Sequence, residues 1–242
     1  MKGEINDWSF YSLGDHAFVF ALEAKMDGLI LQKIKNLNEF ISAKNIIGIF
    51  DIIPSYHTLT IVYDITTFLS VTQSASEQLL YFCNNIITDF ENTLIAKNNI
   101  KSIIYKVPVC YEKCYGLDLE NISLKNKISC AEIIQIHTAF EYVVYSIGFL
   151  PGFTYMGTVN DKIKIDRLHK PRTEVMAGSI GIAGLQTGIY PTNSPGGWQI
   201  IGRTPWKIFD PHPTKLAKFK VGDRVQFYAI SKQAFETLNE NH

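Results

Sequence analysis

The sequence of 242 residues lacks any long apolar run. A membrane-spanning helix needs about 18 to 20 apolar residues in succession, and no stretch of this kind occurs. The first ten residues, MKGEINDWSF, also lack the apolar segment of a secretory signal peptide. We therefore expect a cytoplasmic protein with no membrane partner.

Neither sign of charge is in excess, because Lys and Arg together number 23 and Asp and Glu together also number 23. The overall charge therefore gives no reason to expect a nucleic-acid partner. Cysteine is scarce: there are four, and the close pair Cys110 and Cys114 has neither CxxC spacing nor a second pair. Zinc sites use such pairs, so we predict reduced structural thiols and no metal site, with a redox or metal role as the alternative.

Residues 1–97 carry the pattern of a small α+β domain. Period-two alternation predicts strands, and apolar residues at spacings of three and four predict helices, in the order β-β-α-β-β-α. The strands are expected at 8–13, 16–24, 46–53 and 56–64, and the helices at 28–45 and behind the capping box Ser74–Glu77. The polar run AKNNIK at 96–101 is the expected domain boundary.

Residues 98–242 carry a different pattern. A strand is predicted at 103–110, and Ser129-x-x-Glu132 is a capping box that opens a helix. From Tyr142 onward, short apolar runs are broken by Gly, Pro and Asn, which is typical of a β-barrel or sandwich. A last strand is expected at 224–230, followed by a short helix capped by Ser231.

Most of the 16 glycines lie between Glu141 and Pro205. Aromatic and charged side chains are interleaved with them: Phe149, Phe153, Tyr155, Tyr190 and Trp198, with Lys170, Arg172 and Arg203. Small-molecule sites combine an apolar wall with a few polar anchors in this way. The stretch is therefore the candidate functional region.

The glycines at positions 178, 181 and 184 match neither a Rossmann fingerprint nor a P-loop. We expect them to serve turns and close packing, with backbone contact to a phosphate as the alternative. In the later run, Gly196 and Gly197 allow a close backbone approach, Trp198 offers a flat wall, and Arg203 is an anion clamp. A plain hairpin explains the run from Gly196 to Arg203 equally well. Arg172 is likewise either a site residue or an ordinary surface arginine.

His137 and Glu141 are four residues apart, the spacing of neighbours on one helical face. Such a pair can carry out acid–base chemistry, or it can be structural, with the two side chains satisfied by hydrogen bonds at the end of a helix. Both interpretations stay open. No Ser-His-Asp set and no HExxH motif occurs. A self-contained hydrolase or metalloenzyme is therefore disfavoured.

The motif residues resemble a known family. The segments YSIGFLPGFTYMG, KPRTEVMAGSIGIAGLQTGIYPTNSPGGWQIIGRTP and FDP closely resemble the family of 5-oxoprolinase B subunits, also called allophanate hydrolase subunit 1 or KipI-like. The resemblance is strongest over Val107–Pro211 and weaker but collinear before it. One loop departs from the family: PVCYEKCYGLDL has Glu112, Lys113 and Cys114 where small residues are usual, although Gly116-x-Asp118-Leu119 still matches.

The resemblance implies an α+β protein with a small N-terminal domain, 1–97, and a cyclophilin-like β-barrel, 98–242. It also implies two partners, a sister C subunit that is cyclophilin-like as well and the lactam-utilisation A subunit. Together with this chain they hydrolyse 5-oxo-L-proline to L-glutamate using ATP. Some relatives instead inhibit a sensor histidine kinase, and others form the carboxyltransferase part of biotin-dependent urea carboxylases.

On the enzymatic interpretation, the candidate site faces the sister protein, and arginines neutralise charge that develops on substrate or phosphate. The catalytic candidates are Glu141, Arg172 and Arg203. The substrate-binding candidates are His137, Phe149, Phe153, Tyr155, Gln186, Thr187, Tyr190, Gly196, Gly197 and Trp198.

Overall fold

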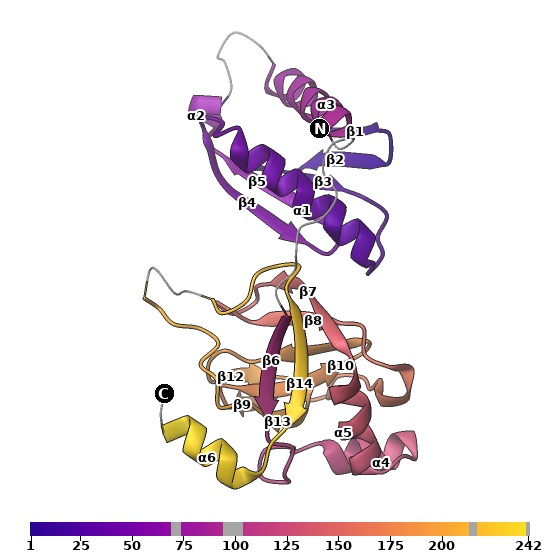
Figure 1. Ribbon diagram of the computed structural model, residues 1–242. Coiled ribbons are helices and arrows are strands. Elements are labelled where there is room, and N and C mark those ends of the chain that lie inside the picture. The colour runs from indigo at the N-terminus through magenta and orange to yellow at the C-terminus, as the bar shows by residue number, and fades with distance from the viewer. Residues whose placement is uncertain (69–73, 94–103, 213–216, 241–242) are drawn as a thin grey trace. The chain divides into compact units, whose positions relative to one another are not determined.

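The computed structural model describes residues 1–68, 74–93, 104–212 and 217–240, and the chain divides into two compact units, Met1–Lys101 and Ser102–His242 (Figure 1). The boundary predicted between residues 97 and 98 lies outside the described residues. Among the helices that are described, none is both long and apolar enough to span a membrane.

The first unit contains an antiparallel five-stranded sheet in the order β1-β2-β3-β5-β4. Its strands are β1 (Lys2–Ile5), β2 (Trp8–Ser12), β3 (Ala17–Ala21), β4 (Ile49–Ser55) and β5 (Thr58–Tyr63). The four predicted strands are confirmed, although the third runs over Ile49–Ser55 rather than 46–53, and the second ends at Ala21 rather than at residue 24. Strand β1 was not predicted, because its residues KGEI show little apolar alternation.

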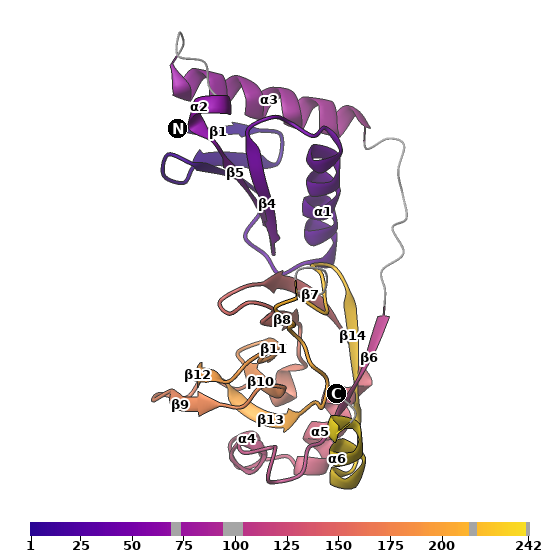
Figure 2. The ribbon, with the colours of Figure 1, turned by 90° about the vertical axis from the view of Figure 1, so that its left-hand side faces the viewer.

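Two long helices cover one face of this sheet, α1 (Gly28–Ala43) and α3 (Ala75–Thr93), and a short helix α2 (Ile65–Phe68) precedes α3 (Figure 2). The Asp27 carboxylate caps α1 by accepting the backbone N–H of Leu29 at 2.7 Å. The apolar stripes of both helices meet alternate residues of the central strands. The buried core they form contains Trp8, Phe10, Phe18, Phe20, Ile34, Leu37, Ile41, Leu59, Ile61, Tyr63, Leu79, Cys83, Ile86, Ile87 and Phe90.

The second unit is built on a seven-stranded sheet in the order β13-β10-β11-β8-β7-β14-β6. Its strands are β6 (Ile104–Val109), β7 (Glu141–Ile147), β8 (Thr154–Gly157), β10 (Ser179–Ala183), β11 (Gln186–Ile189), β13 (Gln199–Arg203) and β14 (Arg224–Ala229). The backbones of Cys110 and Arg203 exchange hydrogen bonds of 2.8 and 3.0 Å, which joins the two edges at one point. The predicted α+β class is confirmed, and this sheet curls as a barrel sheet does.

Helices α4 (Leu119–Asn126) and α5 (Cys130–Ala139) pack on the barrel, a 3₁₀ turn (Asp161–Ile163) follows, and α6 (Lys232–Glu240) ends the described chain. The capping box predicted for α5 is confirmed, since Ser129 Oγ accepts the Glu132 N–H at 3.1 Å. Helix α4 was not predicted because its sequence is largely polar and buries only Leu119 and Ile122.

The point where the barrel edges meet requires a residue without a side chain. A Cβ atom on Gly202 would lie 2.7 Å from Val109 Cγ1 and 2.9 Å from the Cys110 carbonyl oxygen. We expect Gly202→Ala to lower the free energy of unfolding by about 1–3 kcal/mol, because a methyl group overpacks this junction.

The matched control is Gly148→Ala, since nothing lies within 4 Å of a Cβ atom there. We expect that change to alter stability by less than about 0.5 kcal/mol in denaturant unfolding. Equal effects of the two substitutions would contradict the packing account.

Candidate functional site

A second apolar cluster lies on the outer face of the barrel sheet. Strand β10 turns Ile180 and Ile182 into the barrel core and Ala183 outward. A two-stranded ribbon, β9 (Arg172–Val175) paired with β12 (Ser194–Gly196), contributes Val175 to this outer cluster. The outer-face cluster consists of Phe153, Val175, Ala183, Tyr190, Trp198 and Ile200, with Leu150 and Tyr155 packed against it.

Two glycines make room for the indole of Trp198. Gly181 and Gly188 face each other across β10 and β11. A Cβ atom on Gly181 would lie 2.9 Å from Trp198 Cβ, and one on Gly188 would lie 3.0 Å from Trp198 Cζ3. Gly178 and Gly184 have φ angles of +82° and +59°, as turn glycines do. The prediction that these glycines serve turns and close packing is confirmed.

The aromatic rings of the cluster meet edge to face. The Phe153 ring centroid lies 5.0 Å from that of Tyr190 and 5.4 Å from that of Trp198, with interplanar angles of 88° and 80°. Phe149 extends the series outward: its ring is 5.9 Å from Phe153, its side chain is 71% exposed, and its φ angle is +67°. An exposed phenylalanine with this backbone conformation is unusual. These residues were all predicted site residues, and the structure brings them together.

Asp118 fastens the ribbon to the barrel. Its side chain is nearly fully buried, with one carboxylate oxygen 2.6 Å from Arg172 Nη2 and the other 2.6 Å from the backbone N of Ile200. Its own backbone N–H donates to the Ile200 carbonyl oxygen at 2.8 Å. The other terminal nitrogen of Arg172, Nη1, is buried and has no hydrogen-bond partner. Asp118 was matched to the family motif in the sequence but was not assigned a role.

Gly196 and Gly197 bring the backbone close to two different side chains. A Cβ atom on Gly196 would overlap the Tyr190 hydroxyl group, whereas one on Gly197 would lie 3.6 Å from Arg167 Nε. Burial raises the pKa of Tyr190, while the Trp198 backbone N–H and the charge of Arg167 act in the opposite direction. Arg167, which was not among the predicted site residues, therefore lies beside this cluster.

Two of the predicted binding residues lie inside the barrel instead. His137 is fully buried, with Nδ1 2.8 Å from the Tyr111 hydroxyl and Nε2 3.0 Å from Thr187 Oγ1. Its ring stacks on Phe227 with centroids 4.6 Å apart. Burial lowers the pKa of His137 to about 3, so the imidazole is neutral at pH 7.

Glu141 and His137 do not share a helical face, because α5 ends at Ala139 and Glu141 begins β7. The Glu141 carboxylate is exposed and accepts a hydrogen bond from Arg224 Nη1 at 2.9 Å. The expectation of a common helical face is therefore wrong, since the chain turns from helix to strand between the two residues.

Arg203 and Gln186 lie on barrel strands outside the outer-face cluster. Arg203 Nε donates to the Ala177 carbonyl oxygen at 2.8 Å, and its guanidinium lies 5.7 Å from the ring centroid of Phe235 on α6. Gln186 opens β11, opposite Ala183. Arg172 and Arg203 therefore have different partners, and a catalytic role for Arg203 stays a prediction.

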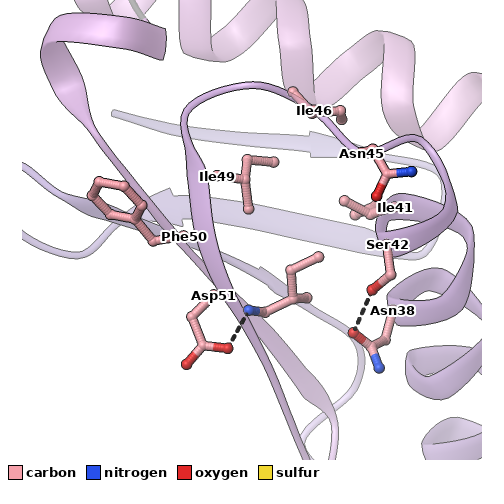
Figure 3. A pocket seen from close by; sticks show the side chains of 9 residues that line it. Asn38, Ile41, Ser42, Asn45, Ile46, Ile49, Phe50 and Asp51 are labelled. Carbon is pink, nitrogen blue, oxygen red and sulfur yellow. Dashed lines mark hydrogen bonds between the residues drawn. The ribbon is translucent and has the colours of Figure 1, made fainter.

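The first unit contains an open groove of about 560 Å³ between the end of α1 and strand β4 (Figure 3). Its lining was not predicted as a site. Asn38 and Ser42 hydrogen-bond each other along one wall, and the Asp51 carboxylate accepts the backbone N–H of Ile52. Across the described ranges of the chain, no group of three or more His, Cys, Asp or Glu side chains is placed to hold a metal ion.

Gly196, the last residue of β12, and Gly197, which follows it, allow a matched pair of substitutions. We expect Gly196→Ala to lower the unfolding free energy by about 1–3 kcal/mol, because the new methyl group meets the rigid, buried Tyr190 ring. Gly197→Ala makes ordinary van der Waals contacts and should leave stability nearly unchanged. Thermal and denaturant unfolding measure both, and a larger loss at Gly197 would contradict this arrangement.

The buried His137 predicts a specific dependence of stability on pH. Its pKa falls from 6.5 in the unfolded chain to about 3 in the folded one, so protons bind preferentially to the unfolded chain between these values. The contribution of the buried, neutral His137 to the free energy of unfolding is complete above pH 6.5 and is lost as the pH falls toward 3. Burial raises the pKa of the neighbouring Tyr142, so that phenol stays neutral in this range.

We expect the unfolding free energy of the wild type to fall by about 1.4 kcal/mol per pH unit more steeply than that of His137→Gln between pH 6 and 4. Denaturant titrations at a series of pH values measure the two slopes. Parallel slopes would show that His137 is not buried in neutral form.

The sequence pattern of the family described as "Carboxyltransferase domain, subdomain C and D" matches residues 8–219. The B subunit of 5-oxoprolinase from Bacillus subtilis is 34% identical over 240 residues, which cover 94% of this chain and 95% of that protein. The urea amidolyase of Lachancea kluyveri is 28% identical over 90% of this chain but only 13% of its own length.

Among solved structures, the protein TTHA0988 is similar with a TM-score of 0.73 and 26% sequence identity. The similarity covers 89% of this chain and 40% of that one, so this chain spans less than half of that protein. The family match and the near full-length relative agree with the motifs between Glu141 and Pro205. The chain therefore belongs to the carboxyltransferase subdomain C and D family, which includes the B subunits of 5-oxoprolinase.

Proposed function

We propose that this chain is the B subunit of an ATP-dependent 5-oxoprolinase that converts 5-oxo-L-proline to L-glutamate. The observation that carries this proposal is the match to the B subunit of the Bacillus subtilis enzyme, which extends over nearly the whole of both chains. The match therefore includes both compact units of this chain. It is not limited to a single domain of the kind that recurs in unrelated proteins.

The chemistry of the reaction assigns a part to the outer-face cluster. A five-membered lactam resists water until its carbonyl is activated, and transfer of a phosphoryl group from ATP to the amide oxygen makes that carbon electrophilic. Guanidinium groups that are held in fixed positions stabilise the negative charge of a phosphoryl group during its transfer. Arg172 is held in this way by Asp118, whereas His137 is sealed in the barrel and supports the fold.

The partners in this proposal are the sister, cyclophilin-like C subunit of the enzyme and its lactam-utilisation A subunit. The name of the Bacillus subtilis relative, which describes one subunit of an enzyme, supports an assembly of several chains. Phe149 is the side chain best placed to enter a partner surface, because a tight turn presents it largely exposed beside the buried rings. ATP is then bound by the assembled complex.

A carboxyltransferase role is the second candidate, and the urea amidolyase match favours it. In that case the chain would act on a carboxylated carrier delivered by another protein. The third possibility, inhibition of a sensor histidine kinase, stays a prediction from the family resemblance.

Reconstitution of the three subunits tests the proposal. We expect ATP-dependent release of glutamate from 5-oxo-L-proline by the complete mixture and loss of that release when this chain is omitted. Arg172→Gln should lower the rate by about tenfold or more, because it removes the charge at the site. Lys113→Gln is the control, since this exposed lysine forms a surface ion pair with Glu120.

Glutamate release that proceeds equally well without this chain would refute the proposal. Carboxyl transfer from a carboxylated biotin carrier, with no glutamate formed, would favour the second candidate instead.

A further inference from the structure

Glu112 joins a loop of the barrel to the C-terminal helix. It lies in the loop Cys110–Leu119, which departs from the family motif. Its carbonyl oxygen accepts the backbone N–H groups of Tyr115 at 2.8 Å and of Gly116 at 2.7 Å, which closes a tight turn. Its carboxylate accepts the backbone N–H of Lys232 at 2.9 Å, which satisfies a free donor in the first turn of α6. One residue therefore fixes both the turn and the start of the helix.

The turn and the helix each contribute one ring to an aromatic pair. The ring centroids of Tyr115 and Phe235 lie 4.4 Å apart, and the interplanar angle is 37°. Phe235 is the one buried residue of α6, and its side chain is 3% exposed. A helix of 9 residues is marginally stable by itself, so α6 depends on the packing of this ring for its place on the barrel.

The guanidinium of Arg203 lies against this aromatic pair. Its Cζ atom is 5.9 Å from the ring centroid of Tyr115 and 5.7 Å from that of Phe235, within the range of cation–π attraction. Its Nε atom also donates a hydrogen bond to the Ala177 carbonyl oxygen at 2.8 Å. These contacts come from three segments that are distant in the sequence, and together they hold the guanidinium in one orientation.

The two terminal nitrogens of Arg203 are left for a ligand. No described residue accepts a hydrogen bond from Nη1 or Nη2, and no described carboxylate forms an ion pair with this arginine. Among the described side chains, the buried atoms that lack a hydrogen-bond partner are Arg172 Nη1 and Ser194 Oγ, so both terminal nitrogens of Arg203 reach solvent. The carboxylate of Glu236 on α6 pairs instead with Lys232 at 3.7 Å.

We propose that Arg203 binds an oxyanion of the reaction, and that Tyr115 and Phe235 are positioning residues that fix the direction of its guanidinium. The planar fork of a guanidinium matches a carboxylate or a phosphoryl group, and a group that is already ordered loses little conformational freedom on binding. The oxyanion is the carboxylate of 5-oxo-L-proline or a phosphoryl group from ATP. This inference rests on the proposed function, and it makes α6 part of the machinery that binds the reactants.

Titration of the full chain at constant ionic strength tests the anion site. Inorganic phosphate and 5-oxo-L-proline are added separately, and the ¹H–¹⁵N signals of the arginine Nε–Hε groups are followed. We expect the Arg203 signal to shift along a saturable curve, and that of Arg224, which pairs with Glu141, to stay unchanged. The anion that binds more tightly identifies the carboxylate or the phosphoryl group as the occupant. An Arg203 signal that responds to neither anion, or that shifts no more than the Arg224 signal, would overturn the inference.

Ring substitutions test the positioning role in the same titration. We expect Tyr115→Leu and Phe235→Leu to weaken anion binding at Arg203 by about threefold or more, because each keeps an apolar side chain but removes a ring. Tyr115→Phe retains the ring and should retain the affinity. Gln233→Ala is the control, since this side chain is exposed on the same helix. Wild-type affinity in both leucine variants would overturn the positioning role.

The rate of glutamate release by the three-subunit mixture separates positioning from a general effect on the fold. Arg203→Gln should lower kcat/KM by about tenfold or more, and Phe235→Leu should lower it less. Phe235→Leu should cause no further loss in the Arg203→Gln background, because the ring acts through the guanidinium. A further loss in the double variant would show that α6 acts through the fold and would overturn the positioning role.

The two assays also distinguish failure of this inference from failure of the proposed function. If the wild-type mixture releases no glutamate while Arg203 binds an anion in a ring-dependent way, the proposed function fails and the anion site stands. A mixture with Arg203→Gln that keeps the wild-type kcat and KM would refute the inference while the function stands.

Discussion

The buried carboxylate of Asp118 is the interaction on which the candidate site depends. It accepts hydrogen bonds from Arg172 on the ribbon and from the backbone of Ile200 on the barrel, and its own backbone bonds to Ile200 as well. A carboxylate that is nearly removed from water is stable only when it is paired and hydrogen-bonded. The ion pair therefore sets where β9 begins and where the guanidinium of Arg172 lies.

The glycines give this arrangement its compactness. Gly181 and Gly188 let Trp198 lie directly against the sheet, and Gly196 lets the ribbon approach Tyr190. The result is a rigid group of rings on the outside of a barrel whose interior is already filled, with His137 neutral among aromatic side chains.

Much of the fold follows from local pattern in the sequence. The stripe of α1, the capping box of α5 and the strand at Arg224–Ala229 depend on neighbouring residues, and each was predicted. Strand β1 and helix α4 were missed, because their short, polar sequences are stabilised by packing against distant elements. Local propensity carries little information where tertiary contacts decide the structure.

The candidate site was also predictable only in part, because some of its residues are marked by local sequence and others are brought there by tertiary contacts. The glycine-rich stretch marked Tyr190, Trp198 and Arg172, because unusual composition is visible in the sequence. Arg167 was missed, since the hydrogen bonds that place its segment, from Leu168 to Gly197 and from Gln199 to Asp166, join residues far apart in the sequence. His137 was assigned to the site from helical spacing alone, and that spacing cannot show which side of a barrel wall a side chain occupies.

A double-mutant cycle on Asp118 and Arg172 is the most direct test of the central claim that their ion pair holds the ribbon on the barrel. Unfolding free energies would be measured for the wild type, Asp118→Asn, Arg172→Gln and the double variant. The account predicts a coupling energy of about 1–3 kcal/mol, because each single change leaves a buried polar group without its partner. Strictly additive effects would contradict it.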